Sequence, residues 1–166
     1  MYHKIQDFLQ DWKAESAITQ KIFNNLSDDS LSQKVYADGR TLGFIAWHIT
    51  ISIGEISSKM GIKVDCPEEN SEPPASAKEI MSAYKNASDS LYEFLEKNWK
   101  DEKLSEESNM YGQMWKNGLS FNVLVTHQIH HRAQMTVLMR QAGLKVPGSY
   151  GPAKEEWAAM GMTAPK

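Results

Sequence analysis

Histidines are the residues of this chain whose type and spacing are best suited to chemistry. Three of the five lie in one short run, His127-Gln128-Ile129-His130-His131. In a helix, His127 and His131 project about 40° apart and lie one turn apart, which is the geometry for two imidazoles that share a metal ion. His130 projects about 60° to the other side of His127. The spacing therefore predicts His127 and His131 as metal ligands.

A further histidine, His48, is predicted to lie on the apolar side of an earlier helix. A single inward histidine is most often a hydrogen-bonded core residue. Three inward imidazoles are harder to satisfy as neutral core groups, because each needs a partner for both ring nitrogens. We therefore predict one metal site formed by His48, His127 and His131, with His3 and His130 outside it.

Other reaction centres fit the sequence less well. In the HExxH motif of zinc proteases the residue after the first histidine is a glutamate that acts as general base, whereas Gln128 stands here and cannot accept a proton at neutral pH. A di-iron bundle needs Glu-x-x-His pairs, and the sequence contains none. Cys66 has only Lys63 as a basic neighbour, so we expect its thiol to be a bystander.

The elements that must position these histidines are predicted to be helices. Apolar residues recur at helical spacing in four long segments, and the β-rich runs with paired turn signals that a sheet requires are missing. We expect helices over about 5–26, 41–60, 76–95 and 120–141. Their predicted end signals are Thr41 and Ser76 as N-caps, the latter in a capping box with Glu79, and Gly61 and Gly143 as stops.

The connecting segments are expected to be irregular. Residues 61–77 are acidic and rich in proline, which is typical of a long crossover loop. Residues 99–118 are polar but carry aromatic and Met side chains, so we expect a loop that packs at a core edge or a pocket mouth. After Pro147 we expect an irregular tail with one short helix. The predicted fold is all-α, one domain over residues 1–166.

Composition excludes several classes of protein. A formal net charge of −3 and no Lys/Arg-rich run disfavour nucleic acid as a partner. No stretch reaches about 18 consecutive apolar residues and no signal-peptide pattern opens the chain, which disfavours the membrane and secretion. With Cys66 as the single cysteine, we expect a cytoplasmic protein.

Two segments of the sequence are distinctive: Arg40-Thr41-Leu42-Gly43-Phe44-Ile45-Ala46-Trp47-His48-Ile49 and His127-Gln128-Ile129-His130-His131-Arg132-Ala133-Gln134. Together they resemble the DinB/YfiT-like superfamily of metalloproteins, and the resemblance extends over essentially the whole chain. The resemblance implies a four-helix bundle of up-down-down-up connectivity, commonly dimeric. It also implies a divalent metal ion, zinc or nickel, on one histidine of the second helix and two of the fourth, which map onto His48, His127 and His131. Ala133 departs from the glycine that the family often has there.

The resemblance also implies a class of reaction, because characterised relatives include transferases that use low-molecular-weight thiols such as bacillithiol, mycothiol or glutathione. Three neutral imidazoles leave a metal position open, where a thiol can bind and lose its proton. We expect Gln134 to hold a water or a ligand imidazole. The substrate is expected to be a small molecule, and the sequence assigns no catalytic residue. Two alternatives remain open: a metal-dependent hydrolase on the same site, and a non-catalytic, stress-associated metal-binding dimer. Glu55 is the one residue that could close the site, but it lies two helical turns beyond His48, so we do not expect both to bind the ion directly.

The back of the last long helix suggests a homodimer. Phe121, Val125, Ile129 and Met139 lie on the side opposite His127, where the surface helix of a monomer should be polar. We expect a second copy to cover them, or alternatively the tail with Tyr150, Trp157 and Met160 to fold over them. Arg132, about 140° from His127, is expected to have a surface or interface role.

Overall fold

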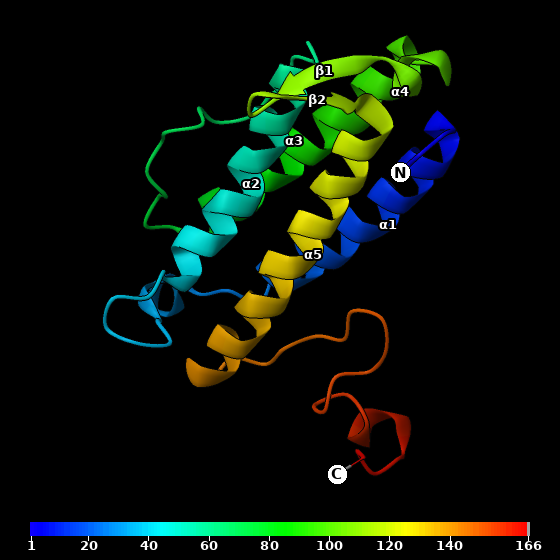
Figure 1. Cartoon of the computed structure of the whole chain (residues 1–166). Coiled ribbons are helices and arrows are strands. Elements are labelled where there is room, and N and C mark those ends of the chain that lie inside the picture. Colours follow the sequence, from blue (N-terminus) through cyan, green and yellow to red (C-terminus); the bar gives the residue numbers. More distant parts are fainter. Residues whose placement is uncertain (166) are drawn as a thin grey trace.

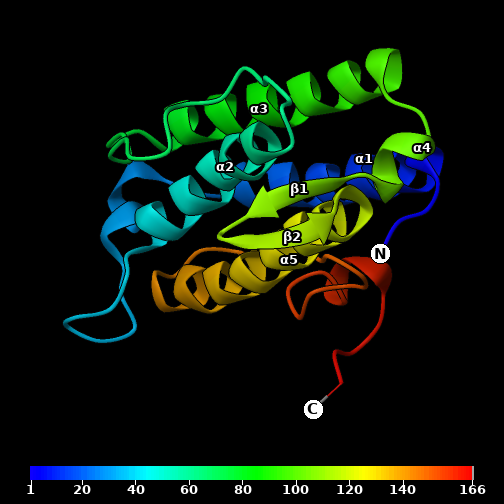
Figure 2. The same cartoon turned by 45° about the horizontal axis from the view of Figure 1, so that its top comes forward.

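The computed structural model describes residues 1–165, which are mostly helical with one small sheet. In chain order the elements are α1 (Ile5–Phe23), the 3₁₀ helix η1 (Asp28–Ser32), α2 (Leu42–Lys59), α3 (Ala77–Asn98), α4 (Glu102–Ser105), β1 (Glu107–Met110), β2 (Gln113–Lys116), α5 (Asn117–Gln141) and the 3₁₀ helix η2 (Ala158–Met160). The four long helices lie alongside one another, with α1 and α5 running one way and α2 and α3 the other (Figures 1 and 2). Within residues 1–165, no helix combines the length and apolar character needed to cross a membrane.

A core of apolar side chains fills the space between these helices. From α1, Phe8, Trp12 and Ile22 are fully buried, as the stripe of apolar residues predicts. The indole nitrogen of Trp12 donates a hydrogen bond to the carbonyl oxygen of Ser88 in α3, 3.1 Å away. Apolar packing and the hydrogen bond of the buried Trp12 indole therefore both hold α1 against α3.

The prediction of an all-α fold is wrong in one segment. Between α4 and α5, β1 and β2 form an antiparallel hairpin in which Met110 pairs with Gln113. Its two turn residues, Tyr111 and Gly112, both have positive φ, at 56° and 85°, as a type I′ turn requires. The side chain of Asn109 accepts a hydrogen bond from the Gly112 amide at 2.9 Å. Strands of four residues are too short to show a period of two, which is why the pattern predicted a loop.

The helix ends follow the predicted signals except at α3. Thr41 caps α2 by accepting a hydrogen bond from the Phe44 amide at 3.0 Å. Ser76 precedes α3 as expected, but its side chain makes no capping bond and the predicted capping box is wrong. The carboxylate of Asp28 accepts from the Ala77 amide instead, at 2.7 Å. A carboxylate brought in by η1 therefore satisfies the end of α3, a partner that a local pattern cannot contain.

The apolar back of α5 is covered within the chain. Phe121 is fully buried, stacks on Phe8 of α1 with ring centroids 4.3 Å apart, and meets Trp99 edge-on at 5.4 Å. Val125 and Met139 are buried too, and Ile129 is half-buried against the core. Because α5 lies between α1 and α2, both of its faces meet a helix of the same chain. The homodimer therefore stays a prediction, without this face as its support.

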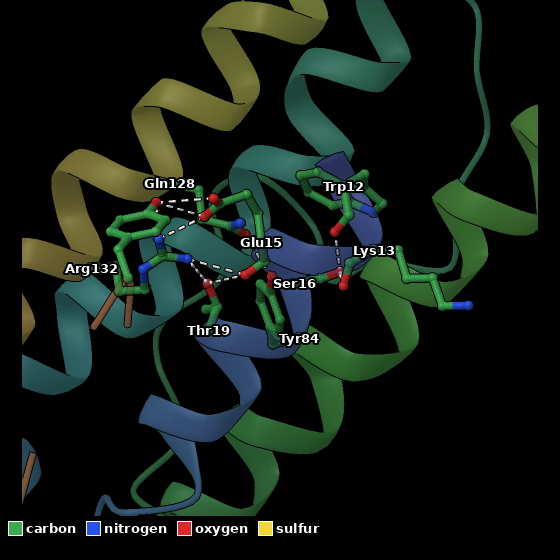
Figure 3. A network of polar contacts seen from close by, with 9 residues as sticks. Trp12, Lys13, Glu15, Ser16, Thr19, Tyr84, Gln128 and Arg132 are labelled. Carbon is green, nitrogen blue, oxygen red and sulfur yellow. Dashed lines mark hydrogen bonds and ion pairs between the residues drawn. The ribbon is translucent and has the colours of Figure 1, made fainter. Parts of the chain in front are cut away.

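The prediction of a surface or interface role for Arg132 is wrong. Its side chain is 2% exposed and forms an ion pair with Glu15 of α1, 2.6 Å between Nη2 and Oε2. Its Nη1 donates to the hydroxyl of Thr19 and to the backbone carbonyl of Glu15, both at 3.0 Å (Figure 3). The Arg132 side chain does point away from His127, as predicted, but it points to α1 rather than to solvent.

Candidate metal centre

Three imidazoles meet between α2 and α5. His48 comes from α2, and His127 and His131 come from successive turns of α5. One potential ligand atom from each lies within 4.8 Å of the others, and the Nε2 atoms of His48 and His127 are 3.1 Å apart. Zinc–nitrogen bonds of about 2.0–2.1 Å in tetrahedral geometry separate two ligand nitrogens by about 3.3 Å. The spacing of the His48 and His127 donors thus fits one first-row divalent ion, and a donor of His131 lies within 4.8 Å of both.

Burial keeps these imidazoles in the neutral form that metal ligation requires. The pKa of His127 is lowered from 6.5 to about 4, mainly by burial and in smaller measure by the neighbouring His131 and His48. The pKa of His48 is lowered first by burial and then by the charges of His131 and Arg40. Burial likewise lowers the pKa of His131. At neutral pH all three rings therefore carry lone pairs available to a cation.

Gln134 fixes the ring of His131. The Nδ1 of His131 lies 2.8 Å from Oε1 of Gln134, so the ring donates its proton there and keeps Nε2 free as a ligand atom. The amide nitrogen of the same glutamine lies 3.2 Å from Nε2 of His130. Metal-binding histidines commonly make such a hydrogen bond with their second nitrogen. Gln134 thus contacts an imidazole of the centre, one of the two roles expected for it.

The other α5 residues of the histidine run lie elsewhere. His130 is exposed, as is His3. Gln128 is 2% exposed and accepts a hydrogen bond from the hydroxyl of Tyr84 in α3 at 2.5 Å, so it points away from the centre. Ala133 is exposed. The position that holds the general base of a zinc protease is therefore occupied here by a residue that holds α5 against α3.

Glu55 and Cys66 lie outside the histidine group. Glu55 accepts a hydrogen bond from the hydroxyl of Tyr111 at 2.6 Å, which ties α2 to the hairpin turn. Burial raises the pKa of the Cys66 thiol to about 11, and its sulfur lies 3.4 Å from the carbonyl oxygen of Thr50. A thiol that stays protonated at neutral pH is a poor nucleophile, as expected for a bystander.

The segment that leads into α2 contributes residues that the sequence analysis did not assign to the site. The Arg40 guanidinium stacks over the ring of Phe44, 4.9 Å from its centroid, and Phe44 in turn stacks beside His48 at 6.2 Å. The indole of Trp47 donates to the carbonyl oxygen of Ser71 at 2.8 Å, holding the long 60–76 connection against α2. Helical spacing marks inward residues and carries no information on which loop folds back beside them.

A family model described as "DinB family" matches residues 1–165. The chain belongs to the DinB family. This DinB chain is 46% identical to YrdA of Bacillus subtilis (strain 168), described as an uncharacterized protein, over 166 residues that cover 100% of this chain and 99% of YrdA.

Solved DinB structures share the fold. A DinB-like protein from Bacillus cereus ATCC 10987 superposes with a TM-score of 0.87 at 42% identity, over 90% of this chain and 100% of that one. A second DinB-like protein, YjoA of Bacillus subtilis, superposes with a TM-score of 0.69 at 18% identity, over 86% of this chain and 96% of the other. The likeness to YjoA concerns the fold alone.

Proposed function

We propose that this protein is a cytoplasmic, metal-dependent transferase that joins a low-molecular-weight thiol to a small-molecule electrophile. In this proposal His48, His127 and His131 hold one divalent ion, zinc or nickel, within a four-helix-bundle scaffold. The observation that carries it is the convergence of three neutral imidazoles with no fourth histidine, cysteine or carboxylate in their group among the described residues. Structural zinc sites are normally closed by four protein ligands, so a group of three supports an open position for a reactant.

The donor set suits thiol activation. Three neutral ligands leave the charge of a divalent ion undiminished, and such an ion lowers the pKa of a bound thiol so that the thiolate forms at neutral pH. His131, fixed by Gln134, keeps its ring oriented while the fourth position exchanges. Burial of the histidines excludes part of the surrounding water, which strengthens the electrostatic stabilisation of a thiolate.

Cavities on two sides give small molecules access to the histidines. One of about 620 Å³ has His130, His131 and Gln134 in its wall. A second, of about 310 Å³, has His48 and Phe44 in its wall. A transferase needs room for two reactants at one centre, and this arrangement supports that requirement.

Metal content and thiol binding test the proposal. The purified full-length chain should contain close to one divalent ion per chain. After replacement by cobalt, addition of a thiol should produce a sulfur-to-metal charge-transfer absorption, because a thiolate replaces water at the ion. The loaded protein should then conjugate the thiol to 1-chloro-2,4-dinitrobenzene. Absence of the charge-transfer band with glutathione, cysteine, coenzyme A and bacillithiol would overturn the thiol-transfer proposal, and hydrolysis of an activated ester by the same protein would favour the hydrolase.

A further inference from the structure

We propose that the thiol carries a carboxylate and that Arg40 binds it, in the cavity between the 33–40 loop and α5. This inference rests on the proposed function and names the class of its thiol substrate. It also assigns a binding role to a residue outside the histidine group.

The cavity adjoins the metal centre directly. Tyr36 and Arg40 line it from the loop, and Gln134 and Val137 line it from α5. His131 forms part of the same wall, so a molecule that fills the cavity contacts one of the three imidazoles of the centre. Tyr36 is 66% and Val137 53% exposed. They offer contact area for the carbon skeleton of a small ligand.

Arg40 is the cation of this cavity, and its charge is unpaired. Among residues 1–165 its guanidinium makes neither an ion pair nor a hydrogen bond, and it lies over the face of Phe44. A planar guanidinium with five donors matches the two oxygens of a carboxylate. Stacking on Phe44 holds the guanidinium in place while its edge stays free.

Asp38 lines the same cavity and carries the opposite charge. It forms no ion pair with Arg40 within the part of the chain that is described. Its carboxylate therefore weakens the attraction of the cavity for an anion without occupying the guanidinium. This makes Asp38 a useful second test, because its removal should act in the opposite direction to removal of Arg40.

The second cavity, on the other side of His48, is lined by negative rather than positive charge. Glu55, Glu69 and Glu72 line it together with apolar residues. A carboxylate placed there would meet like charges, which is unfavourable. The two sides of the centre thus differ in charge, and the difference directs a carboxylate-bearing thiol to the Arg40 side.

The experiment compares two thiols that differ in charge, 3-mercaptopropionate and 2-mercaptoethanol. Each is titrated into the cobalt-loaded full-length protein, and the dissociation constant is read from the charge-transfer band. The Arg40→Gln variant should bind 3-mercaptopropionate about fivefold to tenfold more weakly, as for loss of one partly exposed charge-assisted hydrogen bond, and 2-mercaptoethanol within about twofold. Comparing this ratio of constants between variant and wild type cancels the difference in intrinsic acidity between the two thiols.

Two variants serve as controls. Lys100→Gln removes the same charge beyond the end of α3, away from the cavity, and should leave the ratio unchanged. Asp38→Asn should strengthen binding of 3-mercaptopropionate alone. Equal weakening of both thiols by Arg40→Gln, or no weakening, overturns the role of Arg40 and leaves the proposed function intact. A wild-type protein that shows no band with either thiol overturns the proposed function and the Arg40 assignment with it.

Discussion

Individual side chains decide the chemistry at the residue scale. The spacing of His127 and His131 and the apolar surroundings of His48 were sufficient to predict the group that the structure brings together. The helical projection also placed Gln134 on the side of the centre, where it contacts His131. Arg40 was not predictable as a site residue, because its position depends on how the 33–40 loop folds.

The lowered histidine pKa values predict a pH-dependent stability of the metal-free protein. The unfolded state binds a proton on His127 below pH 6.5 and the folded state only below about pH 4, so stability is complete above pH 6.5 and falls as pH drops through this window. After discounting for partial exposure, we expect His127 to contribute about 1–2 kcal/mol to the fall. Urea unfolding at pH 7 and pH 5 measures the decrease in the free energy of unfolding. This decrease should be smaller in His127→Gln than in the wild type. An equal fall in wild type and variant would contradict the assigned cause.

The hydrogen bond from His131 to Gln134 predicts a graded effect on metal affinity. Gln134→Leu removes the acceptor for the Nδ1 proton, and we expect metal affinity to decrease about tenfold. Gln134→Glu keeps an acceptor oxygen and should retain affinity close to that of the wild type. Competition with a chromophoric chelator provides the measurement. Equal affinity in Gln134→Leu and wild type would show that this contact does not support the ligand.

At the scale of elements, the sequence predicted the four long helices because each has many turns over which the apolar period repeats. It did not predict the hairpin, whose strands are four residues long. It also did not predict the cap of α3, because Asp28 lies 49 residues from Ala77. Local sequence patterns therefore identify helices whose apolar residues repeat over several turns. They miss a helix end that is capped by a residue far away in the sequence.

The cap of α3 gives a matched pair of variants. Asp28→Ala removes the carboxylate that satisfies the Ala77 amide, and we expect a loss of about 1 kcal/mol in the free energy of unfolding. Ser76→Ala removes a side chain that makes no capping bond and should change stability by less than about 0.5 kcal/mol. Urea unfolding of both variants checks the difference. A larger loss of stability in Ser76→Ala than in Asp28→Ala would instead support the predicted capping box.

At the scale of the whole molecule, a buried polar network connects helices that are distant in sequence. Arg132 of α5 reaches Glu15 and Thr19 of α1, and the Tyr150 hydroxyl of the tail contacts Glu15 at 2.9 Å. A weaker pair at the surface, Arg140–Glu155, holds the tail to α5 at 3.2 Å. The first pair is buried and the second exposed, so their contributions should differ greatly.

We expect Arg132→Gln to lower the free energy of unfolding by about 3 kcal/mol, because it leaves Glu15 largely buried without its charge partner. Arg140→Gln, which breaks the exposed pair, should cost less than about 1 kcal/mol. Chemical unfolding of the two variants measures the contrast. A loss of similar size in both would mean that the network around Arg132 does not join α1 to α5 as described.

The central claim is that His48, His127 and His131 hold one ion, and the metal content of single alanine variants tests it most directly. The protein and its variants are loaded with zinc under identical conditions, freed of excess metal and measured by elemental analysis. We expect about one ion per chain in the wild type and in His3→Ala, a smaller loss in His130→Ala, and a sharp loss in each of the three ligand variants. Full occupancy in folded His127→Ala would contradict the account.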